Sequence, residues 1–450
     1  MTQAVTNWFG NIDLEAGTVV EATSAEQIAE VVRDHERYPT PVRAGGSHHS
    51  TTQCGVVDGG TLVLMRRMDR ILHIGEDTVT VQAGALYIDV AQALREHGMQ
   101  FYVNVEIGNL TMGSAACGGT KDASMPGEYG QVSSYAVGVK LVTSSGDVLD
   151  VTDEQPELLQ AVRSSYGLFG IVYEVTFRIR PMLPMSLHHE AYELDSFTKR
   201  LASLRSRDEA MMLYIDPYND VIVVEFRRYI PHGFAREGST WQWRLRNFVW
   251  SKAAPYVSYQ LTTRVRSRAL RYRLVDVFYK IVLLFVARFL HGGHTYATDQ
   301  MIRYPEVSDE SRYTFSIWAF PEARYAQILR DYYAWLHEYT TSTGFRPDMI
   351  HVGYRIAEDQ QALFSYSFDG PVMTIDPVSS GNPGWDEFLV AYNAFCSEHG
   401  GVPLFNQTHL ITRQQVDKAF VGRVAQFAEQ RERHDPDGRF LTAYFRERLT

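Results

Sequence analysis

The feature that most constrains this fold is a turn with two glycines and two histidines, Arg43-Ala-Gly-Gly-Ser-His-His-Ser50, directly after a β-rich segment. Consecutive glycines let several backbone N–H groups converge on one anion without interference from a Cβ atom. The turn therefore suits a pyrophosphate, although glycine pairs are as common in ordinary tight turns. The sequence has no G-x-x-x-x-G-K-[ST] motif, and no G-x-G-x-x-G joins its first strand to its first helix, so nucleotide binding requires another fold.

Strand and helix patterns alternate around this turn. A β-rich segment starts at Thr18, Ser24 is a candidate N-cap for a helix over 24–35, and a second helix is expected over 85–97. This alternation predicts an α/β unit. A strand over 171–179 ends at Arg180-Pro-Met-Leu-Pro, where two prolines predict a domain boundary near residue 183.

The remainder predicts an α+β second domain. Its expected strands and helices alternate less regularly than those of the first unit, and the expected segments are strands over 211–215, 221–229, 312–320, 349–355 and 371–375 and helices over 322–340 and 385–399. A further helix is expected over 414–434.

Charge and cysteine content narrow the class of protein. A formal net charge of -10 argues against nucleic-acid binding. Cys54, Cys117 and Cys396 fit neither a disulfide framework nor a paired-cysteine motif, and no H-E-x-x-H motif occurs, so no metal site is expected. The start of the chain lacks a secretory pattern, and the longest apolar stretch, 281–290, is interrupted by Arg288 and too short to span a bilayer. We expect a soluble, cytoplasmic protein.

One segment departs from the acidic average. Residues 241–290 contain ten lysines and arginines against the single acid Asp276. Apolar residues recur in this segment at helical spacing, namely Leu261, Val265, Ala269, Leu270, Leu274, Val277, Phe278 and Ile281. The pattern predicts a basic amphipathic helix or helical hairpin. It either docks on an anionic membrane or acidic partner, or pairs with acidic groups of its own fold or of a second subunit.

Five segments, in order along the chain, resemble the vanillyl-alcohol oxidase and p-cresol methylhydroxylase flavoprotein superfamily. They are Asn7-Trp-Phe-Gly-Asn, Arg43 to Ser50, Ile107 to Thr120 with Tyr129-Gly-Gln-Val-Ser, Gly167-Leu-Phe-Gly-Ile-Val-Tyr-Glu-Val-Thr, and Asp435-Pro-Asp-Gly-Arg-Phe-Leu-Thr-Ala-Tyr444. Each is weak alone, and together they are specific. Within the superfamily the chain is most similar to the sugar-lactone (L-gulonolactone, D-arabinonolactone) and alditol oxidases.

The resemblance implies an α+β fold in which a two-part FAD domain carries a substrate, or cap, domain with an antiparallel sheet and basic helices. We expect an FAD domain over 1–182, a cap over 183–409, and a C-terminal segment over 410–450 that returns to the FAD domain. Relatives often bond FAD to the histidine before serine in the G-x-x-H-S turn, which here is His49.

The resemblance also assigns cofactor contacts. These fall on Arg43, Ala44, Gly45, Gly46, Ser47, His48 and Ser50 in the turn, on Gly113, Ser114, Gly118, Gly119 and Thr120 in the small-residue stretch, and on Ile171, Val172 and Tyr444. The alternative for each of them is an ordinary turn or strand residue.

The match fails at two positions that relatives use for chemistry. Where relatives have E-x-R on a cap strand, this chain has Gly353-Tyr-Arg355, and where they have a lysine after a G-G-x-P turn, it has Gln407. The reaction type is therefore better supported than a sugar substrate. Candidate catalytic groups are Tyr354, His351 and His409 as bases, with Arg355 and Gln407 beside them, and the alternative for each is a packed core residue or an ion pair.

These observations predict an FAD-dependent oxidase. It would take a hydride from a CH–OH carbon, or second from a CH–NH carbon, of a small molecule, and oxygen would reoxidise the flavin to give hydrogen peroxide. The alternatives are a dehydrogenase or C=C reductase that uses another electron carrier, and a degenerate flavoprotein that serves as a binding subunit.

Overall fold

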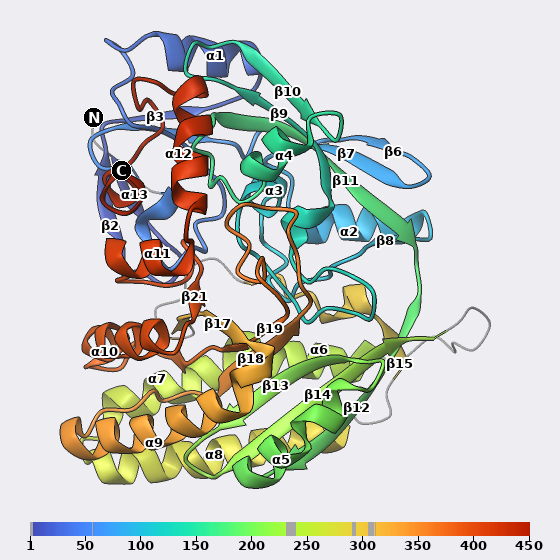
Figure 1. The fold of residues 1–450 in the computed structure, drawn as a ribbon, viewed down its shortest axis with the longest axis vertical. Helices are drawn as coiled ribbons and strands as arrows, with labels where there is room; N and C mark the ends of the chain where they lie inside the picture. Colours follow the sequence, from blue (N-terminus) through green and yellow to red (C-terminus); the bar gives the residue numbers. More distant parts are fainter. Residues whose placement is uncertain (1–2, 56, 231–239, 290–293, 305–309, 311) are drawn as a thin grey trace.

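The computed structural model describes residues 3–55, 57–230, 240–289, 294–304, 310 and 312–450. The chain forms two halves joined along one face (Figure 1), and both termini lie in the first half. Strand β11 (Ile171–Pro181) ends in the first half, and β12 (Pro184–Tyr192) starts the second. The chain therefore crosses between the halves at the proline-flanked residues 181–184.

The first half contains two main sheets and a short hairpin. Its strands are β1 (Gln3–Thr6), β2 (Asp13–Ala16), β3 (Thr18–Glu21), β4 (Val42–Gly45), β5 (Thr61–Leu64), β6 (Ile71–Ile74), β7 (Thr78–Gln82), β8 (Met99–Phe101), β9 (Ala136–Val142), β10 (Val148–Thr152) and β11. Strands β3, β5 and β4 form a parallel sheet. The larger sheet, in the order β10-β9-β11-β7-β6 with β8 beside β11, is antiparallel.

The helices that precede β11 in this half are α1 (Ala25–Arg33), α2 (Tyr87–Glu96), α3 (Met112–Cys117) and α4 (Pro156–Val162). The predicted N-cap of α1 is confirmed, because the Ser24 side chain accepts a hydrogen bond from the Gln27 N–H at 3.2 Å. Helix α3 is short and small-residue-rich, and it lies between the larger sheet and the glycine turn.

The second half is built on an eight-stranded antiparallel sheet in the order β15-β12-β14-β13-β18-β19-β17-β21. Its strands besides β12 are β13 (Ala210–Asp216), β14 (Val221–Tyr229), β15 (His294–Tyr296), β17 (Trp318–Pro321), β18 (His351–Ile356), β19 (Val372–Ile375) and β21 (Val402–Pro403), and a separate pair is formed by β16 (Thr314–Phe315) and β20 (Val378–Ser379). The single strand expected over 312–320 is therefore wrong: residues 316–317 interrupt it, and its two parts join different sheets.

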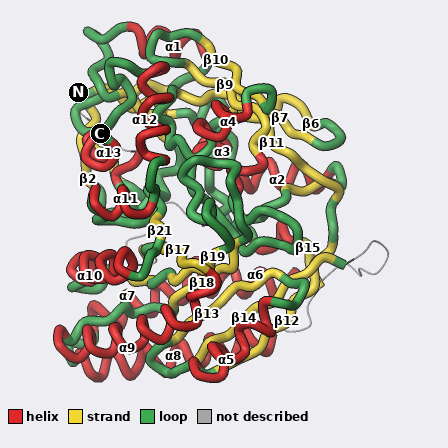
Figure 2. Tube along the Cα trace, viewed as in Figure 1, coloured by secondary structure: helices red, strands yellow, loops and turns green. Residues whose placement is uncertain are grey.

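Helices cover both faces of this sheet (Figure 2). One face carries α5 (Leu194–Arg205), α9 (Tyr325–Thr343) and α10 (Trp385–Glu398), and the other carries α6 (Thr240–Phe248), α7 (Ala254–Arg264) and α8 (Arg268–Phe289). Successive side chains of a strand point to opposite faces of the sheet, so alternate residues pack in two separate hydrophobic cores. Along β13, Met211 and Leu213 pack in the cluster containing α9, whereas Met212 and Tyr214 pack with α8.

The end of the chain returns to the first half, where Figure 1 shows it in red. Its helices are α11 (Arg413–Ala419), α12 (Arg423–His434) and α13 (Ala443–Leu449). The side chain of Arg439 donates to the carbonyls of Val31 and Val32, and the Val42 N–H donates to the Arg439 carbonyl. The single helix expected over 414–434 is wrong, because the chain breaks between α11 and α12 at Gly422, which has φ +74°.

Candidate functional site

The glycine turn forms one wall of a long cavity in the first half. Strand β4 ends at Gly45, and the turn that follows lines the cavity with residues 46–50. Within the described residues, the backbone N–H groups of residues 46–50 make no hydrogen bond to another protein group. His48 has φ +52°, which is rare outside glycine and turns successive N–H groups in a common direction. The turn therefore has free backbone donors and a left-handed residue, which are the features that an anion-binding turn requires.

The N-terminal segment holds this turn in place. Asn7 is buried, and its side-chain amide donates to the Ser50 carbonyl at 3.0 Å, while its oxygen accepts from the N–H groups of Gly10 and Asn11. The Trp8 N–H donates to the His48 carbonyl at 2.8 Å. These bonds explain why the N-terminal motif and the glycine turn occur together in the chain.

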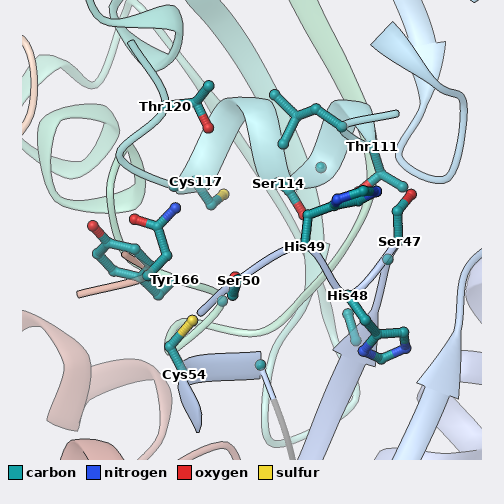
Figure 3. Close-up of a pocket in the computed structure, with 18 of the residues that line it drawn as sticks. Ser47, His48, His49, Ser50, Cys54, Thr111, Ser114, Cys117, Thr120 and Tyr166 are labelled. Atoms are coloured by element: carbon teal, nitrogen blue, oxygen red, sulfur yellow. The ribbon is translucent and has the colours of Figure 1, made fainter. Parts of the chain in front are cut away.

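The two adjacent histidines point in different directions (Figure 3). The ring of His49 is directed toward Thr111 and Ser114 of the opposite wall, and the ring of His48 is directed away from it. His49 also stacks on Trp8, with ring centroids 5.5 Å apart. Burial, with a smaller contribution from His48, lowers the pKa of His49 to about 4. The imidazole is therefore neutral at physiological pH and keeps a free nitrogen lone pair.

Small residues allow the two walls of the cavity to approach closely. A Cβ atom on Gly46 would lie 2.6 Å from Thr111 Oγ1. Gly170 also lines the cavity, and a Cβ atom there would lie 2.3 Å from the Val142 carbonyl oxygen of the neighbouring strand β9. Asn406 also lines the cavity, and its buried Oδ1 has no hydrogen-bond partner. A cavity lined by free backbone donors, by several glycines and by an unsatisfied amide oxygen can hold a dinucleotide with a planar ring system.

A second cavity adjoins the first, at the contact between the two halves. Ile107, Thr120 and Gln407 line both cavities. Aromatic and aliphatic side chains dominate the second cavity, including Trp250, Tyr304, Tyr313, Phe315, Met349 and Tyr354. A ligand in the second cavity would therefore contact a group that fills the first, with residues of both halves around it.

A buried ion pair lies on the wall of the second cavity. Lys121 Nζ is 3.1 Å from Asp376 Oδ2, and their side chains are only 3% and 4% exposed. The same ammonium lies 3.7 Å from the centre of the Tyr354 ring. Asp376 Oδ1 is buried without a hydrogen-bond partner. Burial raises the pKa of Asp376 to about 6 against the opposing effect of Lys121, and burial also lowers the pKa of Lys121.

Further charges beside this pair are already paired. Arg227 Nη1 donates to Asp122 Oδ2 at 2.9 Å, and its Nε donates to Glu225 at 2.6 Å. Arg246 Nη2 lies 2.6 Å from Glu106, which also accepts from the Tyr304 hydroxyl at 3.0 Å. Asp376 therefore differs from Asp122 and Glu106 in having a buried carboxylate oxygen that makes no hydrogen bond.

The structure separates the catalytic candidates. Tyr354 and Gln407 line the second cavity. His351 and Arg355 do not line it. Successive side chains of a strand point to opposite faces of the sheet, so His351 and Arg355 share one face and Tyr354 lies on the other. His351 Nε2 is 2.9 Å from the Tyr332 hydroxyl of α9, and Arg355 pairs with Glu322. His409 lines neither cavity. The expectation that these three face a substrate is corrected.

The expected cofactor contacts are mostly placed along the first cavity. Its lining includes Ala44, Gly46, Ser47, His48, His49, Ser50, Gly113, Ser114, Gly118, Thr120 and Val172. Gly45, Gly119, Ile171 and Tyr444 do not line it. The Tyr444 hydroxyl instead donates to the Phe405 carbonyl at 2.7 Å. Arg43 reaches the cavity wall, but its guanidinium donates to the carbonyls of Cys54 and Gly167, so it braces the wall and is not free for phosphate.

Sequence reasoning missed several lining residues. Lys121 and Asp376 were not anticipated, and only the position of Lys121 directly after the small-residue stretch could have indicated it. Sequence reasoning also missed that the loop between β18 and β19 contacts the first half. Its Asp359 accepts from Gln131 at 3.2 Å, and Arg163 donates to Gln361 at 2.8 Å, so the loop packs deep against the first half.

The basic segment forms a helical hairpin, with the break at residues 265–267 between α7 and α8. The apolar face predicted from Leu270, Leu274, Val277 and Ile281 is exposed, and α8 packs on the sheet through a different set, Val275, Tyr279, Val282, Leu283 and Val286. No helix in the described ranges has the length and apolarity to cross a bilayer.

These features define a flavoprotein oxidoreductase with a two-part FAD domain and a cap. A family model for the FAD binding domain matches residues 16–152, and a model for D-arabinono-1,4-lactone oxidase matches residues 175–448. The second match covers more than half of the chain, so the chain belongs to the D-arabinono-1,4-lactone oxidase family.

Full-length relatives agree with this assignment. The chain is 23% identical to the L-gulonolactone oxidase of Mus musculus over 97% of this chain and 96% of that protein. It is 21% identical to the L-gulono-1,4-lactone dehydrogenase of Mycobacterium tuberculosis (strain ATCC 25618 / H37Rv) over 100% of both. A solved structure of a solvent-stable cholesterol oxidase has a TM-score of 0.77 at 13% identity, covering 100% of this chain and 98% of that one, which shows the shared fold alone.

Proposed function

We propose that this chain is an FAD-dependent oxidase that acts on a CH–OH group of a small molecule bound in the second cavity. FAD held along the first cavity would accept the substrate hydride at N5 and pass the electrons to oxygen, giving hydrogen peroxide. The observation that carries the proposal is the buried, unpartnered carboxylate oxygen of Asp376 in a cavity that adjoins the cofactor channel. A CH–NH group is the second candidate for oxidation.

Asp376 is the proposed proton acceptor for the substrate hydroxyl. Hydride loss from an alcohol carbon is assisted when a base accepts the hydroxyl proton, and the best base has a pKa near the working pH. Burial gives Asp376 a pKa of about 6, so the carboxylate is ionised at neutral pH and still basic enough to accept a proton. Lys121 donates to one oxygen of this carboxylate, and the other oxygen has no hydrogen-bond partner and would be the one that accepts the proton.

The second cavity holds an acid and a cation, although two charged positions of the family pattern are lost in this chain. Relatives are expected to have an acid at the position of Gly353 and a lysine at the position of Gln407. In this chain the acid Asp376 and the cation Lys121 line the second cavity, which Gln407 also lines. This favours an active enzyme over a degenerate binding subunit.

We further propose covalent attachment of FAD through His49. Its imidazole is neutral, lines the cofactor cavity and is held against Trp8, so a ring nitrogen is available as a nucleophile. His48 lines the same cavity, but its ring points another way (Figure 3).

The three cysteines are all buried and unpaired, which supports a cytoplasmic location.

The decisive experiment is anaerobic mixing of the yellow protein with a panel of alcohols and aldonolactones, followed by admission of air. We expect bleaching of the flavin by at least one compound and rapid recovery of the colour with release of hydrogen peroxide. Bleaching with slow recovery in air would instead identify a dehydrogenase. A colourless purified protein that no compound affects would support a binding subunit and reject the enzyme.

A further inference from the structure

We propose that the exposed face of α8 docks this protein on the surface of an anionic phospholipid bilayer. Leu270, Leu274, Val277, Ile281 and Leu284 are 40–64% exposed. At 100° per residue all five lie within an arc of about 80°, and they extend for about 21 Å along the helix axis. A continuous apolar stripe of this length in water is uncommon on a monomer and marks an interaction surface.

The buried side of α8 does not need this stripe. Val275, Tyr279 and Val286 already anchor the helix on the sheet, each less than 9% exposed. The helix thus carries two apolar faces, one used by the fold and one turned outward. Phe278 and Phe285 are half-buried beside the outer stripe and widen it on one edge.

The charges around the stripe select its partner. Arg273 and Lys280 are exposed along its other edge, and Arg288 is exposed at its C-terminal end. The single acid of the helix, Asp276, is directed inward to Arg346. An apolar stripe whose exposed charged neighbours on α8 are Arg273, Lys280 and Arg288 matches a membrane interface, where acyl chains contact the apolar side chains and anionic headgroups contact the cations.

A second copy of this chain fits the stripe less well. A symmetric contact would bring Arg273, Lys280 and Arg288 of one copy against the same cations of the other, with no exposed acid on either helix to compensate. Within the described residues, Arg246 is the member of the basic segment that forms an internal ion pair, so the exposed cations remain available to lipid.

The test is sedimentation of the full-length, FAD-loaded protein with vesicles of phosphatidylcholine alone or with 30% phosphatidylglycerol. We expect binding to the anionic vesicles that weakens in high salt. Val277→Glu/Ile281→Glu places acids at two positions that are 60% and 61% exposed and should weaken binding at least about tenfold, because each apolar side chain loses its burial. Arg273→Gln/Lys280→Gln should weaken binding about fivefold for each cation removed.

Val390 and Val421, which are 58% and 76% exposed outside this face, give the matched control. Val390→Glu/Val421→Glu should bind vesicles like the unmodified protein. All variants should keep their flavin absorbance, which separates a docking defect from misfolding and from failure of the proposed oxidase activity. The proposal is overturned if the unmodified protein ignores anionic vesicles or if the acidic pair on α8 binds them normally. A dimer that the same pair dissociates, without vesicle binding, would also overturn it.

Discussion

The ammonium of Lys121 lies 3.1 Å from the carboxylate of Asp376, although 255 positions separate them in the chain. Lys121 comes from the first half, and Asp376 follows β19 in the cap. The contact brings an acid and a cation to the wall of the proposed substrate cavity, and neither residue stands at a motif position where relatives are expected to carry these charges.

Asp376→Asn should slow flavin reduction by about 10²- to 10⁴-fold, because the amide cannot accept the substrate proton. The measurement is the anaerobic bleaching rate with the alcohol that reduces the unmodified protein fastest. Asp369→Asn, which alters an exposed carboxylate paired with Arg423, is the control. Equal bleaching rates for Asp376→Asn and the unmodified protein would remove Asp376 from the reaction.

The rate of flavin reduction should rise with pH through about 6, because Asp376 must lose its proton before it can act as a base. Lys121→Met should shift this rise in the rate to higher pH, because the Lys121 charge opposes the effect of burial on the Asp376 pKa. The measurement is the pH profile of the bleaching rate for both proteins. If the bleaching rate of Lys121→Met rises at the same pH as that of the unmodified protein, Lys121 does not set the pKa of the catalytic base.

His49→Ala should abolish covalent attachment while the turn still binds FAD. Acid precipitation should leave the unmodified pellet yellow and release the flavin of His49→Ala into the supernatant. His48→Ala, which changes the neighbouring side chain of the same turn, should keep a yellow pellet. Free flavin from the unmodified protein would return His49 to a noncovalent role.

Gly46→Ala should reduce FAD incorporation, because its Cβ would meet Thr111 Oγ1 at 2.6 Å and narrow the channel. Overpacking of this kind costs about 1–3 kcal/mol. Gly55→Ala is the matched control, since Gly55 lines the same cavity and a Cβ there has open space. The measurement is the ratio of flavin to protein absorbance after purification with added FAD. Full incorporation in Gly46→Ala would show that this approach does not limit binding.

Arg355→Met should leave the bleaching rate unchanged, because the side chain pairs with Glu322 on the face of the sheet opposite the cavity. It should lower the free energy of unfolding by about 1 kcal/mol, as expected for a partly exposed ion pair. Denaturant unfolding and anaerobic bleaching together test both statements. A large loss of rate without loss of stability would restore Arg355 as a catalytic candidate.

Local patterns decided much of the first half. The cap at Ser24, the β-strand before Gly45 and the free N–H groups after it depend on residues close in sequence, so periodicity and glycine placement were sufficient to predict them. The basic hairpin was also predictable, because its charge and apolar spacing are properties of one continuous segment. The family resemblance supplied FAD, the cap domain and the return of the C-terminal segment.

The sequence by itself could not orient β18 or choose the partner of Lys121. His351, Tyr354 and Arg355 lie within five positions, and only the packing of α9 on one face of the sheet decided that Tyr354 alone reaches the cavity. The ion pair of Lys121 with Asp376 likewise required the two halves to dock. Side-chain identity determines what chemistry a residue can perform, but burial and the partners that set a pKa depend on contacts between distant segments, and those exist only in the folded chain.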